Sequence, residues 1–128
     1  MTNAATPNFV SPLIIAEGWD VAFYSSEDAV NRDIEPWYPS EVEYRAFDSE
    51  GRKLELSVER QKTPRRWLWS GTYERIIVRA VENEPGHSQE LKVFLTDWLP
   101  IVGAPKPAPD TPLAELLRLA IERSDLDP

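Results

Sequence analysis

The stretch that decides the fold is Val42–Val58, with the sequence VEYRAFDSEGRKLELSV. Apolar and polar residues alternate on both sides of its central DSEG, with the period of two that is typical of half-buried β-strands. Aspartate suits the first position of a type I turn, and glycine suits the left-handed position that follows. The stretch therefore predicts a β-hairpin with its turn at residues 48–51.

The register of this hairpin follows from the alternation. A three-residue loop with a glycine bulge places Asp48 opposite Arg52. On the polar face we expect Arg45 opposite Glu55 as an ion pair, with Phe47 as an exception near the turn. A shift of the register by one residue would turn the apolar side chains of one strand toward water. The expected apolar pairs are Ala46–Leu54, Tyr44–Leu56 and Val42–Val58.

The N-terminal part predicts a second hairpin and a short helix. Residues 1–12 are polar and are expected to form a loose arm. Residues 13–16 and 21–24 are apolar strands, with Gly18 in the turn between them. Ser25 or Ser26 can cap a helix over about 27–34, which Pro36 and Pro39 end.

The C-terminal part predicts a strand and two amphipathic helices. The strand covers about residues 74–82, and the helices begin near Ser88 and Thr111 with apolar residues at helical spacing. A Pro-rich connection, residues 103–110, joins the two helices. We expect a single α+β domain over residues 1–128. Its antiparallel sheet of about five strands is built from hairpins, with one short helix after the second strand and two C-terminal helices on one face.

The charge is unevenly distributed. The chain has 22 acidic and 14 basic residues and a net charge of −8. Residues 1–50 contain ten acidic and only two basic residues, so this part carries the whole excess. Such a region repels phosphate backbones, which argues against nucleic acid, and attracts a basic protein. The alternative is a solvated face that only aids solubility.

No arrangement of residues typical of a catalytic, metal or cofactor site stands out in the sequence. The chain has no cysteine, which excludes disulfides, thiolate metal sites and a cysteine nucleophile. The single histidine, His87, could act with Glu84, Glu90 or Asp97, but we expect it to be exposed and inert in the first turn of a helix. No metal-binding motif and no Gly-rich phosphate loop is present, so no cofactor is expected and an enzyme is disfavoured.

Residues 60–72, RQKTPRRWLWSGT, combine four bases with Trp67 and Trp69. We interpret them as an irregular hairpin connection whose tryptophans either cover a sheet edge or contact a protein. A nucleic-acid platform is the third interpretation, against which the overall acidity counts. The apolar run at residues 13–16 is too short for a signal peptide or a membrane span, so a cytoplasmic protein is expected.

Four short stretches carry a resemblance: FYS at 23–25, EDA at 27–29, IEP at 34–36 and YRAFDSEGR at 44–52. They resemble small bacterial proteins in which a Phe-x-Ser-x-Glu-x-Ala helix start and an Ile/Leu-Glu-Pro stop precede an Ala-x-Asp-x-Glu-Gly-Arg-x-Leu hairpin. The similarity covers roughly residues 13–60. Proteins of this type are similar to toxin-neutralising immunity proteins. The resemblance implies a binding role and transfers no site residue.

The sequence therefore predicts a non-catalytic, cytosolic bacterial protein, an acidic immunity or inhibitor protein that binds a toxin or another basic protein. Two alternatives stay open: a homodimer formed through the open sheet face or an exchanged C-terminal helix, and, more remotely, an enzyme that uses His87. The residues expected to contact the protein partner are the acidic Glu27, Asp28, Asp33 and Glu35 and the aromatic Trp67 and Trp69.

Overall fold

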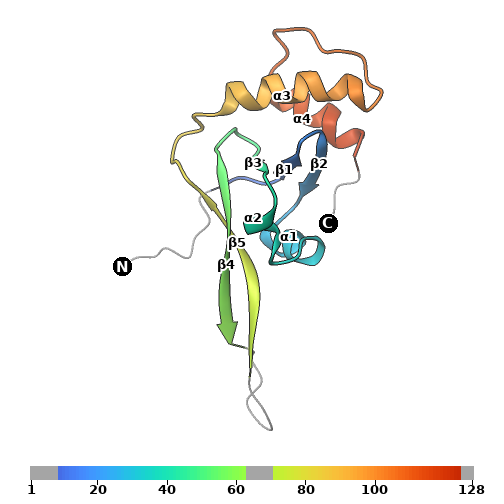
Figure 1. Ribbon diagram of the computed structural model, residues 1–128. Helices are drawn as coiled ribbons and strands as arrows, with labels where there is room; N and C mark the ends of the chain where they lie inside the picture. The colour runs from blue at the N-terminus through green and yellow to red at the C-terminus, as the bar shows by residue number, and fades with distance from the viewer. Residues whose placement is uncertain (1–8, 63–70, 125–128) are drawn as a thin grey trace.

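The computed structural model describes residues 9–62 and 71–124 and has an α+β fold with antiparallel sheets, as predicted (Figure 1). Most of the predicted loose arm lies outside the described residues. The elements, in chain order, are β1 Leu13–Glu17, β2 Asp20–Tyr24, α1 Glu27–Asp33, α2 Tyr38–Glu41, β3 Arg45–Phe47, β4 Leu54–Lys62, β5 Thr72–Ala80, α3 Ser88–Ile101 and α4 Leu113–Glu122.

The described strands divide between two sheets instead of forming the predicted single one. One sheet has the strand order β2-β1-β3, and the other is the hairpin β4-β5. The β1–β2 hairpin forms as predicted, with Gly18 at a φ of 59° in its turn. The β4–β5 hairpin pairs Leu56 with Val78 and Val58 with Ile76, and its far end extends away from the other elements (Figure 1).

The predicted hairpin at residues 42–58 is correct at its turn and wrong in its strands. The Asp48 N–H donates to the Arg52 carbonyl oxygen at 2.9 Å, and Gly51 has a φ of 94°. One bridge, Phe47 with Lys53, continues this register. Beyond it the chains separate, and β3 pairs with β1 instead.

The pairs expected from the alternation are therefore replaced by other contacts. Arg45 lies 3.7 Å from Glu90 of α3, while Glu55 is opposite Arg79 of β5. Tyr44 reaches β4 only through its hydroxyl, which contacts the backbone of Leu56. The pairs that do not form are Ala46–Leu54, Tyr44–Leu56 and Val42–Val58.

The physical reason lies in β3, which is buried on both faces. Ala46 belongs to one core and Phe47 to another, and both are 1% exposed. A strand covered on both faces carries no alternation that identifies its partner. The turn after β3 docks under α3, where a Cβ on Gly51 would lie 2.3 Å from the Cα of Ser88. Glycine is required there for its backbone conformation and for this close approach.

The three-stranded sheet separates the two cores. On one face, Ile14, Phe23 and Phe47 pack against α3 and α4; on the other, Leu13, Ile15 and Ala46 pack against α1 and the β4–β5 hairpin. The α3 stripe is buried as its spacing predicts. Its buried residues are Leu91, Phe94, Leu95, Trp98 and Leu99.

The start of α1 follows its sequence signal, whereas the start of α4 does not. The Ser26 hydroxyl accepts from the Ala29 N–H and caps α1, as predicted. The cap of α4 is Pro112, whereas Thr111, the predicted cap, hydrogen bonds to the Ala108 carbonyl oxygen. The helix α4 packs against α3 of the same chain.

Candidate functional site

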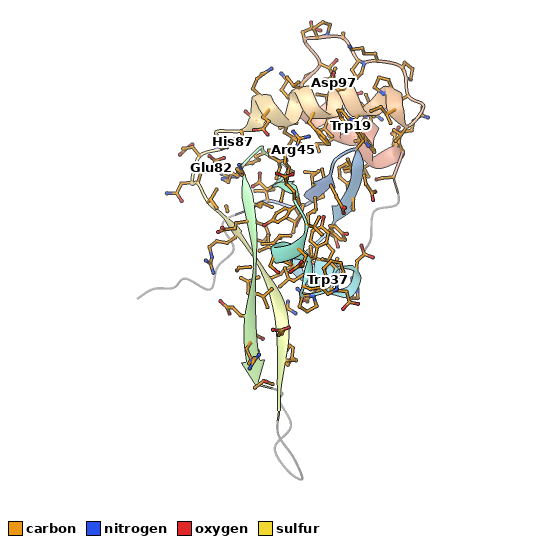
Figure 2. All side chains as sticks on the ribbon, viewed as in Figure 1. Trp19, Trp37, Arg45, Glu82, His87 and Asp97 are labelled. Atoms are coloured by element: carbon orange, nitrogen blue, oxygen red, sulfur yellow. The ribbon has the colours of Figure 1, made fainter. Side chains whose placement is uncertain are left out.

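A concave surface surrounds Trp37, which lies between α1 and α2 (Figure 2). Its side chain is 57% exposed, and it lines two neighbouring pockets. The local sequence is Pro36-Trp37-Tyr38-Pro39, in which the prolines end α1 and begin α2. The prolines hold the two aromatic residues in a turn with little conformational freedom.

The first pocket, here called the acidic pocket, has a volume of about 290 Å³. Glu17 and Asp20 reach it from the two ends of the β1–β2 turn, and Asp33 and Glu35 reach it from the end of α1. Its lining contains four acidic and no basic residues. The other lining residues are Ile15, Ala22, Tyr24, Ile34, Trp37 and Tyr38.

Two tyrosines orient the carboxylates of the acidic pocket. The Tyr24 hydroxyl donates to Asp33 at 2.6 Å, and the Tyr38 hydroxyl lies close enough to Glu17 for that carboxylate to affect its pKa. Burial, and then the negative charges of Glu17 and Asp20, raise the pKa of Tyr38 above its ordinary value. The Tyr38 hydroxyl therefore stays neutral at neutral pH.

The second pocket, here called the proline groove, has a volume of about 480 Å³. It lies between the turn that carries Trp37 and the core-facing side of β4. Five of its eight lining residues are apolar, and Glu74 is its charged residue. Its lining is Pro36, Trp37, Pro39, Ser40, Leu56, Ser57, Val58 and Glu74.

The predicted acidic contact residues separate into two pairs. Asp33 and Glu35 line the acidic pocket. Glu27 and Asp28 instead form ion pairs with Arg75 of β5 and raise its pKa, Asp28 more strongly than Glu27. Glu27 and Asp28 thus join α1 to the hairpin.

Two predicted contact residues, Trp67 and Trp69, lie outside the described residues. Sequence reasoning missed Glu17, Asp20 and Trp37. The signal that could have found Trp37 is an aromatic pair between two prolines inside the acidic part of the chain.

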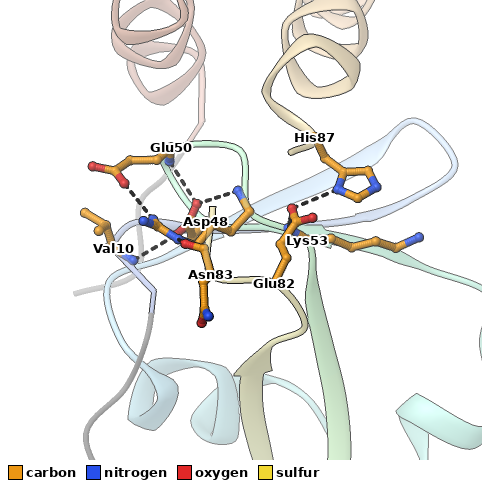
Figure 3. A network of polar contacts seen from close by, with 8 residues as sticks. Val10, Asp48, Glu50, Lys53, Glu82, Asn83 and His87 are labelled. Atoms are coloured by element: carbon orange, nitrogen blue, oxygen red, sulfur yellow. Dashed lines mark hydrogen bonds and ion pairs between the residues drawn. The ribbon is translucent and has the colours of Figure 1, made fainter. Parts of the chain in front are cut away.

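His87 takes part in a polar network below the start of α3 (Figure 3). Its Nδ1 lies 2.8 Å from Glu82, which also accepts from the Lys53 N–H at 2.9 Å. These contacts hold the chain before α3 against the turn at residues 48–51. The structure does not bring His87 to Glu90, which pairs with Arg45.

In the same network, Asp48 is completely buried and accepts hydrogen bonds from the backbone N–H groups of Val10, Glu50 and Arg52. The Arg52 guanidinium, 3.1 Å away, compensates its charge. This carboxylate therefore holds the turn together and joins it to the segment at Val10 (Figure 3).

Residues 9–62 and 71–124 contain no group of three or more histidine and acidic side chains placed to hold a metal ion. Within the same ranges, no helix is both long enough and apolar enough to cross a membrane. No protein-family model, curated protein or solved structure matches this chain.

Proposed function

We propose that this protein is a non-catalytic binding protein that holds a basic protein at the acidic pocket. An immunity or inhibitor protein acting in a bacterial cytoplasm is the form of this role that we favour. The observation that carries the proposal is the convergence of four carboxylates, from two separate segments, beside the exposed ring of Trp37.

The chemistry of the acidic pocket suits a lysine or arginine side chain. A cation that enters it is attracted by the four carboxylates among its lining residues and is repelled by no basic lining residue. The face of Trp37 adds a cation–π contact worth about 0.5–1 kcal/mol at an exposed site. The surrounding acidic region increases the rate of encounter with a basic protein.

Several charged groups outside the acidic pocket are engaged in holding the fold. Glu27 and Asp28 bind Arg75, His87 binds Glu82, and Asp48 binds the turn. The carboxylates of Asp20 and Glu35, by contrast, are exposed at the pocket rim. A partner can therefore reach them without disrupting the fold.

The test compares two fourfold variants with the wild type as immobilised baits in a lysate of the source organism. The pocket variant is Glu17→Gln, Asp20→Asn, Asp33→Asn and Glu35→Gln. The matched control neutralises four exposed acids outside the pocket: Glu55→Gln, Glu84→Gln, Asp97→Asn and Asp110→Asn. Both reduce the net charge by the same amount, and neither touches the Arg75 ion pairs.

We expect the wild type and the control to retain the same basic protein at about 50 mM salt and to release it at about 500 mM salt. The pocket variant should retain at most about a tenth as much. Retention by the pocket variant equal to that by the control, or no retention by the wild type, would contradict the proposal.

A further inference from the structure

The β4–β5 hairpin leaves the core beside the proline groove (Figure 1). Its core-facing residues Leu54 and Leu56 are buried, but Val58, two residues further along the same face, is 37% exposed. The apolar face of the hairpin thus continues past the core and forms one wall of the proline groove. Pro36 and Trp37 form the opposite wall.

Side chains cover the outer edges of the hairpin where it packs on the core. On β5, Asn31 hydrogen bonds to both backbone groups of Ile76, and Glu27 accepts from the Val78 N–H at 2.8 Å. On β4, the Tyr44 hydroxyl contacts both backbone groups of Leu56. These contacts block strand addition at the inner part of both edges.

The edge of β4 is different at Val58. Backbone groups of an antiparallel strand alternate in direction, so Val58 points its N–H and C=O to the same edge as Leu56. This position lies one step beyond the Tyr44 hydroxyl and borders the proline groove. An extended chain laid along the groove can pair with Val58 there, as peptides do at sheet edges in other recognition domains.

We propose that the proline groove takes an extended segment of the basic partner, paired with β4 at Val58. The segment places an apolar side chain between Val58 and Trp37, and a neighbouring lysine or arginine in the acidic pocket on the other side of Trp37. This inference rests on the proposed function and specifies how the same partner is held. Charge complementarity selects the occupant, because the groove opens beside four carboxylates.

The test is a selection from a random peptide library displayed on phage, with the folded full-length protein as target. Enriched peptides should combine an apolar residue with a nearby lysine or arginine. Trp37→Ala should weaken them at least about tenfold. The matched control is Trp19→Ala, because Trp19 is similarly exposed, at 50%, but lines neither pocket.

Backbone methylation of a selected peptide tests the strand pairing. A methyl group on each amide nitrogen in turn should weaken binding at alternate positions, since alternate N–H groups of an added strand face β4. The inference would be overturned if no peptide were enriched or if the enriched peptides lacked a basic residue. It would also be overturned if Trp37→Ala bound them as well as the wild type does, or if the effect of methylation did not alternate along the peptide.

Two results separate this inference from the proposed function. If a basic protein is captured and is lost with the pocket variant, but no peptide shows the pattern above, the function stands and the extended segment is wrong. If the protein forms a dimer in sedimentation that Trp37→Ala disrupts, the groove holds a second copy of the chain, which overturns the inference.

Discussion

The Asn31 side chain occupies the outer edge of β5 at Ile76, donating to its carbonyl oxygen at 2.9 Å and accepting from its N–H at 2.8 Å. One amide thus makes the two hydrogen bonds that a neighbouring strand would make. The helix α1 thereby closes this edge of a two-stranded sheet, and the contact orients the end of α1 that carries the acidic pocket.

Asn31→Ala should lower the free energy of unfolding by about 1–3 kcal/mol, because it leaves the backbone groups of the buried Ile76 without partners. Urea unfolding followed by circular dichroism measures the change. The control is Gln89→Ala on the exposed side of α3, which should stay within about 0.5 kcal/mol of wild type. Equal stability of the two variants would show that the edge contact is unimportant.

Asp48→Ala should be more harmful, with a loss of about 3 kcal/mol or more. It removes the acceptor of three backbone N–H groups and one of the partners of the Arg52 guanidinium, which keeps Glu50 and the Asn83 carbonyl oxygen. Thermal unfolding compared with Asp97→Ala, an exposed acid of α3, measures the effect. A Tm equal to that of Asp97→Ala would be inconsistent with this role.

Glu82 should make stability depend on pH in the acid range. The side chain of His87 and then the Lys53 N–H lower the pKa of Glu82 below its ordinary value of 4.5. The unfolded chain therefore binds the Glu82 proton at a higher pH than the folded chain does. The stabilisation is complete above pH 4.5 and is lost as the pH falls through the lowered pKa.

The measurement is urea unfolding of wild type, Glu82→Gln and His87→Gln at several pH values from about 7 to about 3. The loss of stability below pH 4.5 should be smaller in both variants than in the wild type. Parallel curves for all three proteins would show that the Glu82–His87 contact is absent in solution.

A double-mutant cycle can distinguish the observed partner of Arg45 from the one that the alternation predicts. Arg45 lies near Glu90 and above the ring of Phe94, 4.4 Å from its centre. The Arg45–Glu90 pair is exposed, so its coupling should be about 0.2–1 kcal/mol and should decrease at high salt. The coupling energy of Arg45 with Glu55 should be near zero. A larger coupling energy with Glu55 than with Glu90 would support a β3–β4 hairpin.

Local signals in the sequence predict the turns, the helices α1, α3 and α4 and the buried stripe of α3, but not the short helix α2. Gly18 and Gly51 adopt positive φ in turns where the sequence places them, and Ser26 caps α1. Each of these features depends on residues within a few positions of one another. Their physical causes are therefore visible in the sequence.

The alternation of apolar and polar residues does not show which strand pairs with β3, because this pairing depends on contacts with residues far away in the sequence. Ala46 and Phe47 face different cores, and the strand that binds them, β1, lies about thirty residues earlier. The acidic pocket has the same origin, since Glu17 and Asp20 meet Asp33 and Glu35 only after α1 folds back beside the β1–β2 hairpin. Charge counting finds the acidic region but cannot show which carboxylates share a pocket.

The most direct test of the acidic pocket as the partner's binding surface is photo-crosslinking from its central ring. Trp37→p-benzoylphenylalanine and, as control, Trp19→p-benzoylphenylalanine are irradiated in a lysate of the source organism at about 50 mM salt. One basic protein should be crosslinked from position 37 but not from position 19, and about 500 mM salt should abolish this crosslink. Crosslinking of the same protein from position 19 alone, or no salt-sensitive product from position 37, would contradict this prediction.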